Sequence, residues 1–253
     1  MTSTGPMNAS AEDLKSNEFS GRPEIVTCPI CIKPRPPQLI FKRSDGVGIW
    51  HCRDCDIMYA SPRFSDDSLL EIYENEAFAD LSLYDDWSYD RWKRENKDRF
   101  YVTQVLKHEL LKPFLSKEDR ILDVGCGTGL FSLEMSRHGF RVEGIEPSSR
   151  LVEIGDNVLN VPIHHGLLDD FKPAHRYKGI FVWDVLEHVS NPVALVKRCH
   201  DLMEEGGYLF VQVPNYDGLS NRWKTFLCRR GLKKTDFKHF GFPWHRAFSG
   251  PTK

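Results

Sequence analysis

Residues 121–129, Ile-Leu-Asp-Val-Gly-Cys-Gly-Thr-Gly, constrain this chain more than any other stretch, because three glycines alternate directly after an apolar run. An amphipathic segment, residues 130–137, follows them. This order predicts a strand, a tight turn and a helix. Glycines allow the backbone to adopt positive φ angles and to approach a ligand closely. The turn therefore predicts a ligand-binding loop, with an ordinary strand-to-helix connection as the alternative.

An acidic residue stands where the second strand of such a unit should end. The apolar run at residues 140–145 is followed by Glu146, about 20 residues after the first glycine of the turn. A carboxylate at this place suits hydrogen bonding to ribose hydroxyls. The turn departs from the dinucleotide fingerprint G-x-G-x-x-G, because Leu130 occupies the position of the third glycine.

The segment resembles the first motif, D-x-G-x-G-x-G, of the class I S-adenosylmethionine-dependent methyltransferases. S-adenosylmethionine carries no phosphate, so its site needs close backbone approach and a ribose acceptor instead of a cationic cradle. The resemblance implies that an aspartate orients the turn, that the turn contacts the cofactor, and that an acid holds the ribose. The residues implied are Asp123, Gly125, Cys126, Gly127, Gly129 and Glu146.

Strand and helix patterns alternate after residue 115. Strands are predicted near residues 120–124, 141–145, 161–164, 178–184 and 207–213, and helices near residues 128–138, 148–157, 191–203 and 218–228. This alternation predicts an α/β fold, a Rossmann-like and mostly parallel sheet with helices on both faces. Ligands of such sheets bind at the carboxyl ends of the strands.

The resemblance also places contacts to the adenine after the third predicted strand, which ends at Gly166. Leu168 matches the apolar contact, and Asp169 matches the acid that binds the amino group. The alternative is a solvated helix start, where Asp169 and Asp170 would favour the helix N-terminus.

Residues 177–189 resemble the fourth motif of the ubiquinone-pathway methyltransferases. Trp183 and Asp184 end the central strand, where a ligand would lie, and Glu187 and His188 follow. His188 is a candidate general base for an acceptor hydroxyl, since histidine titrates at about 6.5. Alternatively, Asp184, Glu187 and His188 hold a second, divalent ion that lowers the pKa of the acceptor. A third possibility is a histidine that is simply hydrogen-bonded within the loop.

Two Cys-x2-Cys pairs, Cys28/Cys31 and Cys52/Cys55, are separated by 20 residues near the amino terminus. This spacing is a strong signature of a zinc site. Four thiolates would fill the tetrahedral shell of Zn²⁺, so the ion would be structural. The residues between the pairs predict a small β-hairpin ribbon. Four unligated thiols, or His51 replacing one cysteine, are the alternatives.

The chain is organised as a disordered tail (1–20), a zinc ribbon (21–66), a helical connecting segment (67–115) and a cofactor-binding domain (116–253). The last domain is expected to be truncated, because the 40 residues after Val213 contain no pair of strand patterns to close the sheet. Tyr84, Tyr89 and Asn215 are additional candidates for covering the cofactor or facing the acceptor.

The composition limits the choice of partners. The net charge is −2, which gives no general argument for nucleic acid. No apolar run approaches the ~20 residues of a membrane span, and paired cysteines suit a reducing, cytoplasmic location. The resemblance implies methyl transfer to oxygen, carbon or nitrogen of a small molecule such as a sugar or phenol. The alternatives are an RNA or protein methyltransferase that binds its partner through the ribbon, and a non-catalytic, metal-stapled binding module.

Overall fold

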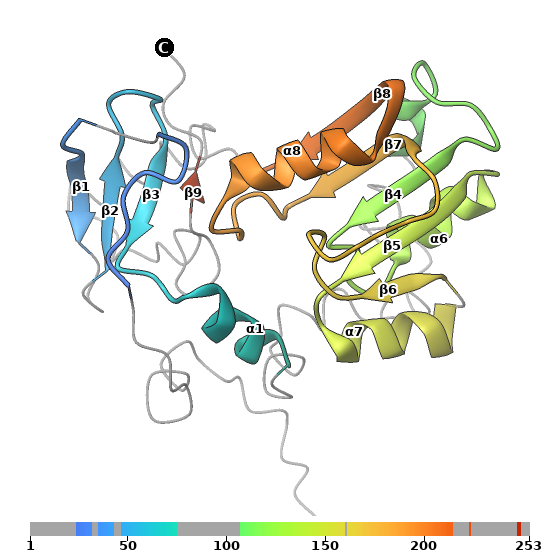
Figure 1. The fold of residues 1–253 in the computed structure, drawn as a ribbon, viewed down its shortest axis with the longest axis horizontal. Coiled ribbons are helices and arrows are strands. Elements are labelled where there is room, and N and C mark those ends of the chain that lie inside the picture. The colour runs from blue at the N-terminus through green and yellow to red at the C-terminus, as the bar shows by residue number, and fades with distance from the viewer. Residues whose placement is uncertain are drawn as a thin grey trace, which may run out of the picture. The chain divides into compact units, whose positions relative to one another are not determined.

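The computed structural model describes seven parts of the chain, and Figure 1 shows their fold; these are residues 24–31, 35–42, 47–74, 107–159, 161–214, 223 and 247–248. Contacts divide the chain into two compact units, one of residues 1–20 and 70–167 and the other of residues 21–69 and 168–253. The predictions for the tail, most of the connecting segment, Tyr84, Tyr89, Asn215 and the helix near residues 218–228 lie outside the described residues, except for position 223.

The first unit contains three parallel strands with helical connections. In chain order its elements are β4 (Arg120–Val124), α6 (Leu130–Arg137), β5 (Arg141–Glu146), α7 (Ser149–Ile154), the π-helical turn η2 (Gly155–Leu159) and β6 (Ile163–His165). Strand β5 pairs with both β4 and β6. Asp123 lies opposite Gly144, and Glu146 lies opposite His165. The predicted strands at residues 120–124 and 141–145 are thus confirmed.

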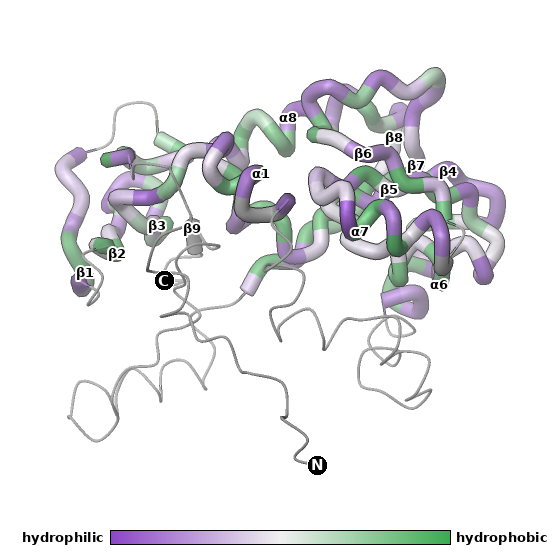
Figure 2. Tube along the Cα trace, turned by 90° about the horizontal axis from the view of Figure 1, so that it is seen from below, coloured by the Kyte–Doolittle hydropathy of each residue, from purple (hydrophilic) through white to green (hydrophobic). Residues whose placement is uncertain are grey.

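The core of this unit follows from its sequence. Ile121 and Leu122 are consecutive on β4 and completely buried, as expected of a strand in the middle of a parallel sheet. Helix α6 carries hydrophobic residues between polar ones, as its hydropathy in Figure 2 shows, and it buries Phe131 and Met135. This amphipathic pattern lets one side of α6 pack on the sheet while Arg137 stays exposed.

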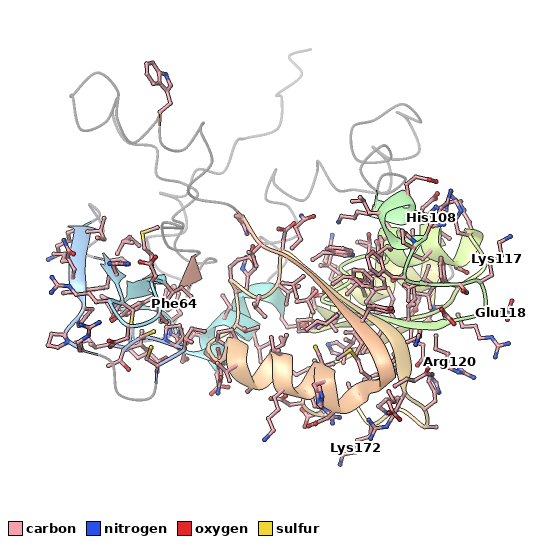
Figure 3. The ribbon with its side chains drawn as sticks, turned by 90° about the horizontal axis from the view of Figure 1, so that it is seen from above. Phe64, His108, Lys117, Glu118, Arg120 and Lys172 are labelled. Carbon is pink, nitrogen blue, oxygen red and sulfur yellow. The ribbon has the colours of Figure 1, made fainter. Side chains whose placement is uncertain are left out.

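Charged residues occupy the amino-terminal end of β4, as Figure 3 shows for Lys117, Glu118 and Arg120. Glu118 forms an ion pair with Arg141 at 2.8 Å, and both side chains are more than half exposed. An exposed pair of this kind contributes little to stability. This end of the strand is therefore a solvated surface, whereas the buried acids Asp123 and Glu146 lie towards the carboxyl ends of β4 and β5.

The second unit contains β7 (Tyr177–Trp183), α8 (Pro192–Leu202) and β8 (Met203–Gln212), and the two strands are parallel. The rings of Phe181 and Phe210, from opposing positions on the two strands, stack at 4.9 Å. Helix α8 begins as predicted, because the Asn191 side chain accepts a hydrogen bond from the Ala194 amide and Pro192 is the first helical residue.

Strand β8 begins four residues earlier than the sequence predicts. An irregularity in the pairing separates Tyr177 from Gly179 on β7, and this break accommodates Gly206 at a φ of 66°. The strand order of the larger sheet is β6-β5-β4-β7-β8. The expected α/β fold with a parallel sheet is confirmed.

The second unit also holds a small antiparallel sheet around the cysteines. Its strands are β1 (Gln38–Lys42), β2 (Gly48–His51), β3 (Met58–Ser61) and β9 (Ala247–Phe248), in the order β1-β2-β3-β9. The predicted hairpin is β1–β2, but the sequence did not reveal that residues 247–248 join this sheet. Helix α1 (Asp66–Glu74) follows β3. Among the described residues, no helix has the length and apolar character needed to span a membrane.

Candidate functional site

The glycine loop between β4 and α6 is built from left-handed backbone conformations. Gly125, Gly127 and Gly129 have φ angles of 66°, 58° and 80°. Residues with side chains are disfavoured there, which explains why glycine recurs at alternate positions. The amides of Gly125 and Cys126 donate to the Ile145 carbonyl at 2.8 and 3.2 Å. The end of β5 therefore fixes the shape of the loop.

The loop is packed on one side and open on the other. A Cβ atom on Gly144 would lie 2.6 Å from the Cys126 sulfur, so the strand beneath the loop has no room for a side chain. A Cβ atom on Gly127 would meet nothing within 4 Å. The backbone at Gly127 can consequently be approached closely by a ligand.

Glu146 joins the end of β5 to this loop. Its Oε2 accepts a hydrogen bond from the Gly127 amide at 2.9 Å, and its Oε1 accepts one from the Ser148 amide at 3.0 Å. The side chain is only 7% exposed, and burial raises its pKa to about 7 although these two amides oppose the shift. Each carboxylate oxygen keeps a further lone pair that can accept a bond from a sugar hydroxyl.

Asp123 is buried at the end of β4. Its carboxylate accepts a hydrogen bond from the Ser132 hydroxyl at 2.8 Å, which ties the strand before the glycine loop to the helix after it. Burial raises the pKa of Asp123 to about 7, against the effect of the Ser132 hydrogen bond. This geometry agrees with a residue that orients the turn.

Cys126, between the first two glycines, packs against the protein. Burial raises the pKa of its thiol well above the usual value, and the charges of Asp123 and Glu146 add to the shift. A thiol in such surroundings is a poor nucleophile. Its backbone, and not its sulfur, is therefore the part suited to shaping the loop.

The end of β7 carries the second group of predicted residues. The Trp183 ring packs 5.5 Å from that of Phe181. Asp184 has a φ of 52°, a left-handed conformation that aspartate tolerates better than most residues. Its carboxylate accepts a hydrogen bond from the Gln212 side chain at 2.7 Å, and its amide donates to the Gln212 carbonyl at 2.9 Å. Gln212, which the sequence did not single out, thus fixes Asp184.

Glu187 and His188 lie together in the loop between β7 and α8. Glu187 is 3% exposed, and its carboxylate oxygens accept no hydrogen bond within the part of the chain that the structure describes. Burial raises its pKa to about 7, and the charge of Asp184 acts in the same direction. The Nε2 atom of His188 lies 4.0 Å from Glu187 Oε1. A proton taken up by the imidazole would be stabilised by this carboxylate when it is ionised.

The predicted adenine contacts have different surroundings. Leu168 is buried and Asp169 is exposed. The guanidinium of Arg198, on α8, donates to the carbonyls of Leu168, at 3.3 Å, and Phe171. Arg198 thus holds the backbone of this segment. No pattern in the sequence points to Arg198, because its partners are main-chain carbonyls of residues distant in the chain.

The four cysteines converge as their spacing predicts. The sulfurs of Cys28 and Cys55 are 3.5 Å apart, those of Cys31 and Cys52 are 3.7 Å apart, and all four lie within 4.8 Å of one another. Zinc–sulfur bonds of about 2.3 Å in a tetrahedron require sulfur separations of about 3.8 Å. The donor set and its size therefore fit a zinc ion.

Two alternatives for metal binding receive no support from the geometry. His51 is hydrogen-bonded to Asp56 at 2.6 Å, and the cysteine cluster is complete without it. The cysteine cluster is also the sole group of three or more potential ligands that converges among the described residues. The side chains of Asp184, Glu187 and His188 accordingly do not converge as ligands of a second ion would, so the structure does not support that prediction.

The pKa of the Cys52 thiol is lowered to about 7. Burial acts against this shift, but hydrogen bonds from the backbone amides of Cys55 and Asp54 outweigh it. Such amides stabilise the thiolate, which is the form of cysteine that binds metals. The backbone of the turn that contains Cys52 thus favours the thiolate form of this residue.

Known proteins match the larger part of this chain. The family model described as a methyltransferase domain matches residues 95–244, which is more than half of the chain. The ubiquinone biosynthesis O-methyltransferase of Coxiella burnetii (strain Dugway 5J108-111) is 29% identical over 144 residues, covering 54% of this chain and 62% of the relative. That of Acinetobacter baumannii (strain ACICU) is 31% identical over 104 residues, covering 38% and 44%.

This chain thus spans less than two thirds of the length of these curated relatives. Among solved structures, CalS10, an amino pentose methyltransferase from Micromonospora echinaspora with bound S-adenosylmethionine, is 20% identical with a TM-score of 0.43. The match covers 50% of this chain and 56% of CalS10. The match of the family model over residues 95–244 establishes that this chain belongs to the methyltransferase-domain family.

Proposed function

We propose that this protein transfers a methyl group from S-adenosylmethionine to a small-molecule acceptor. The observation that carries the proposal is the buried carboxylate of Glu146, which is joined to an open glycine loop by the Gly127 amide. This arrangement offers a carboxylate that can accept hydrogen bonds from ribose hydroxyls and a loop backbone that a ligand can approach closely. It contains no cradle for a phosphate. Membership of the methyltransferase-domain family supports the same reading.

S-adenosylmethionine, when bound, supplies an activated methyl group on a sulfonium. The contribution of the protein is mainly alignment. In our proposal Glu146 accepts hydrogen bonds from the ribose hydroxyls. The loop is shaped by Gly125, Gly127 and Gly129. Asp123 stabilises the loop through its hydrogen bond with Ser132. We also propose the contacts that the resemblance implies: Leu168 and Asp169 contact the adenine, and Trp183 contacts the ligand at the end of its strand.

We assign proton removal to the loop between β7 and α8. His188 accepts the proton of an acceptor hydroxyl, and Glu187, 4.0 Å from Nε2, stabilises the resulting imidazolium when it is ionised. Asp184, held by Gln212, adds negative charge beside Glu187. An oxygen acceptor is the first to test, because the two curated relatives reported above are named O-methyltransferases.

The cysteine cluster is proposed to bind one structural zinc ion. Four sulfur ligands leave no open position for substrate or water, so the ion would stabilise the small sheet and take no part in the chemistry. The cysteines of the cluster are free thiols, which suits the reducing conditions of the cytoplasm that we propose as the location.

Titration calorimetry with S-adenosylmethionine tests the first half of this proposal, and a methyl-transfer assay against pooled metabolites tests the second. We expect one donor site per chain and methylation of a small molecule. Binding of a nicotinamide dinucleotide in place of the methyl donor would overturn the proposal. Donor binding without any methylated product, from metabolites, RNA or proteins, would instead favour a non-catalytic binding module.

A further inference from the structure

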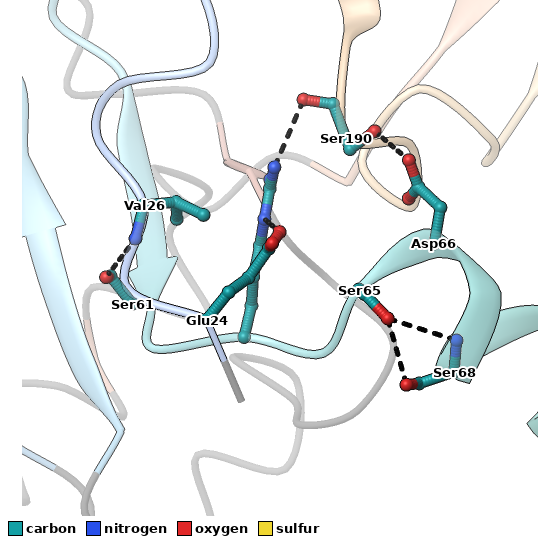
Figure 4. A network of polar contacts seen from close by, with 8 residues as sticks. Glu24, Val26, Ser61, Ser65, Asp66, Ser68 and Ser190 are labelled. Carbon is teal, nitrogen blue, oxygen red and sulfur yellow. Dashed lines mark hydrogen bonds and ion pairs between the residues drawn. The ribbon is translucent and has the colours of Figure 1, made fainter. Parts of the chain in front are cut away.

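Ser190 is held at two points by the segment that follows the cysteine module, as Figure 4 shows. Its carbonyl accepts a hydrogen bond from Nη2 of Arg63 at 3.4 Å, and its hydroxyl donates to the carboxylate of Asp66. Ser190 lies two residues after His188 and directly before Asn191, the cap of α8. The two contacts therefore act at the end of the loop that carries Glu187 and His188.

The arginine side of this contact is firmly attached to the cysteine module. The side chain of Arg63 is 11% exposed, and its Nε lies 3.7 Å from the carboxylate of Glu24. The backbones of Glu24 and Arg63 exchange hydrogen bonds of 2.7 and 2.9 Å. Two residues before Cys28, the Val26 amide donates to the Ser61 hydroxyl at 3.0 Å. Hydrogen bonds thus connect Arg63 and its neighbours with the chain that leads directly into the first cysteine pair.

The aspartate side is fixed by the start of α1. Asp66 is the first residue of the helix, and Ser65 caps it by accepting a hydrogen bond from the Ser68 amide at 3.2 Å. The hydroxyls of Ser65 and Ser68 are 2.9 Å apart. Asp66 is exposed, so its hydrogen bond with Ser190 would be weak by itself. The hydrogen bond from the largely buried guanidinium of Arg63 is the second contact that defines the orientation of Ser190.

The loop between Asp184 and Ser190 also contains a hydrogen bond of its own. Within it, the His188 amide donates to the Val185 carbonyl at 2.9 Å. The carboxylate of Glu187 receives no hydrogen bond from the described residues, so it does not anchor the loop. The loop that carries the imidazole is thus held at both ends, at Asp184 by Gln212 and at Ser190 by Arg63 and Asp66.

We propose that Arg63 and Asp66 are positioning residues, which hold residues 185–190 so that His188 and Glu187 are placed for proton removal from the acceptor. This inference rests on the proposed function for its chemical consequence, but the restraint on the loop can be measured without turnover. It also gives the cysteine module a role, because Glu24, close to the first cysteine pair, holds the arginine that contacts the loop.

The test compares Arg63→Ala and Asp66→Ala with matched controls in the same parts of the chain. Arg35→Ala removes an arginine of the cysteine module that pairs with Asp54, and Asp67→Ala removes the neighbouring acid of α1. Asp66→Asn keeps an oxygen that can accept the bond from Ser190. Zinc content, measured for every variant, reports whether the module is intact.

We expect amide hydrogen exchange at residues 186–190 to accelerate in Arg63→Ala and Asp66→Ala, and to stay unchanged in Asp66→Asn and both controls. With an acceptor, kcat should fall about 10-fold or more in the first two variants, because small displacements of a catalytic group are costly. The Kd and KM for S-adenosylmethionine should remain within about twofold, because neither residue belongs to the glycine loop.

Unchanged exchange at residues 186–190 in folded, zinc-containing Arg63→Ala and Asp66→Ala would overturn the inference. Should Arg63→Ala fail to fold, Ser190→Ala, which removes only the hydroxyl donated to Asp66, gives the same readout. Accelerated exchange in a protein that methylates nothing would support the restraint while contradicting the proposed function. Accelerated exchange with unchanged kcat would overturn the catalytic part of the inference.

Discussion

The carboxylate of Glu146 accepts a hydrogen bond from the Gly127 amide at 2.9 Å, so the acid that ends β5 and the middle glycine of the loop form one structure. The Ser148 amide holds the other carboxylate oxygen at 3.0 Å. An acid positioned in this way need not reorganise to meet a ligand. The loop and the proposed ribose acceptor are therefore expected to respond together to mutation.

Gly127→Ala should weaken binding of S-adenosylmethionine more than it destabilises the fold. The φ of 58° costs a residue with a side chain about 1 kcal/mol, and the added methyl group would occupy the open space beside the backbone. Gly139→Ala is the matched control, because Gly139 has a φ of 93° and lies outside the loop. Thermal unfolding should show similar losses for both variants, and calorimetry a loss of affinity for Gly127→Ala alone.

The buried acids Asp123 and Glu146 should make the protein less stable as the pH rises from about 4 to about 7. In the folded state the pKa of each is raised to about 7, whereas carboxyl groups in the unfolded chain titrate near 4. The folded state then holds protons that the unfolded state releases, so stability falls across this range and levels off above it.

Denaturant unfolding at several pH values measures this dependence. Asp123→Asn keeps an oxygen that accepts the bond from Ser132 and removes one raised titration while those of Glu146 and Glu187 remain, so its curve should be flatter. A variant curve parallel to that of the original protein would show that Asp123 ionises normally.

The cysteine cluster should retain one zinc ion per chain, measured by elemental analysis after exhaustive dialysis. Cys52→Ser should lose the ion, because it removes one of the four converging sulfur ligands. His51→Ala should keep it, since His51 pairs with Asp56 outside the cluster. Equal zinc content in both variants would contradict the assignment of the four ligands.

His188→Gln should lower kcat about 100-fold or more with an oxygen acceptor, the usual range for loss of a general base, while donor affinity stays the same. In the original protein, kcat should rise as the pH passes through about 7, where Glu187 ionises and can stabilise the imidazolium. Glu187→Gln should have a lower kcat and lose this part of the pH profile. A profile unaltered by Glu187→Gln would remove Glu187 from the mechanism.

The sequence predicted the parts of the fold that depend on local patterns. The apolar runs and glycines predicted β4, β5 and the loop between them, because strand burial and positive φ angles leave clear traces in residue types. The cysteine spacing predicted the cluster for the same reason. Asn191-Pro192 predicted the start of α8, since a cap and a proline at the first helical position are both local requirements.

The contacts that the sequence did not reveal join residues far apart in the chain. Arg198 binds the carbonyls of Leu168 and Phe171, and Arg63 binds the carbonyl of Ser190. A carbonyl is present at every position, so such partners leave no pattern of residue types. The pairing of β9 with β3 is hidden in the same way, because a two-residue strand is too short for periodicity to indicate.

Calorimetric titration of Glu146→Ala with S-adenosylmethionine shows whether this carboxylate holds the ribose, with Glu143→Ala, a partly exposed acid of the same strand, as the control. We expect Glu146→Ala to weaken affinity by at least about 10-fold, because it loses the charge-assisted hydrogen bonds to the ribose, while Glu143→Ala binds normally. Unchanged donor affinity in a folded Glu146→Ala protein would show that the ribose is held elsewhere and that Glu146 has no part in binding it.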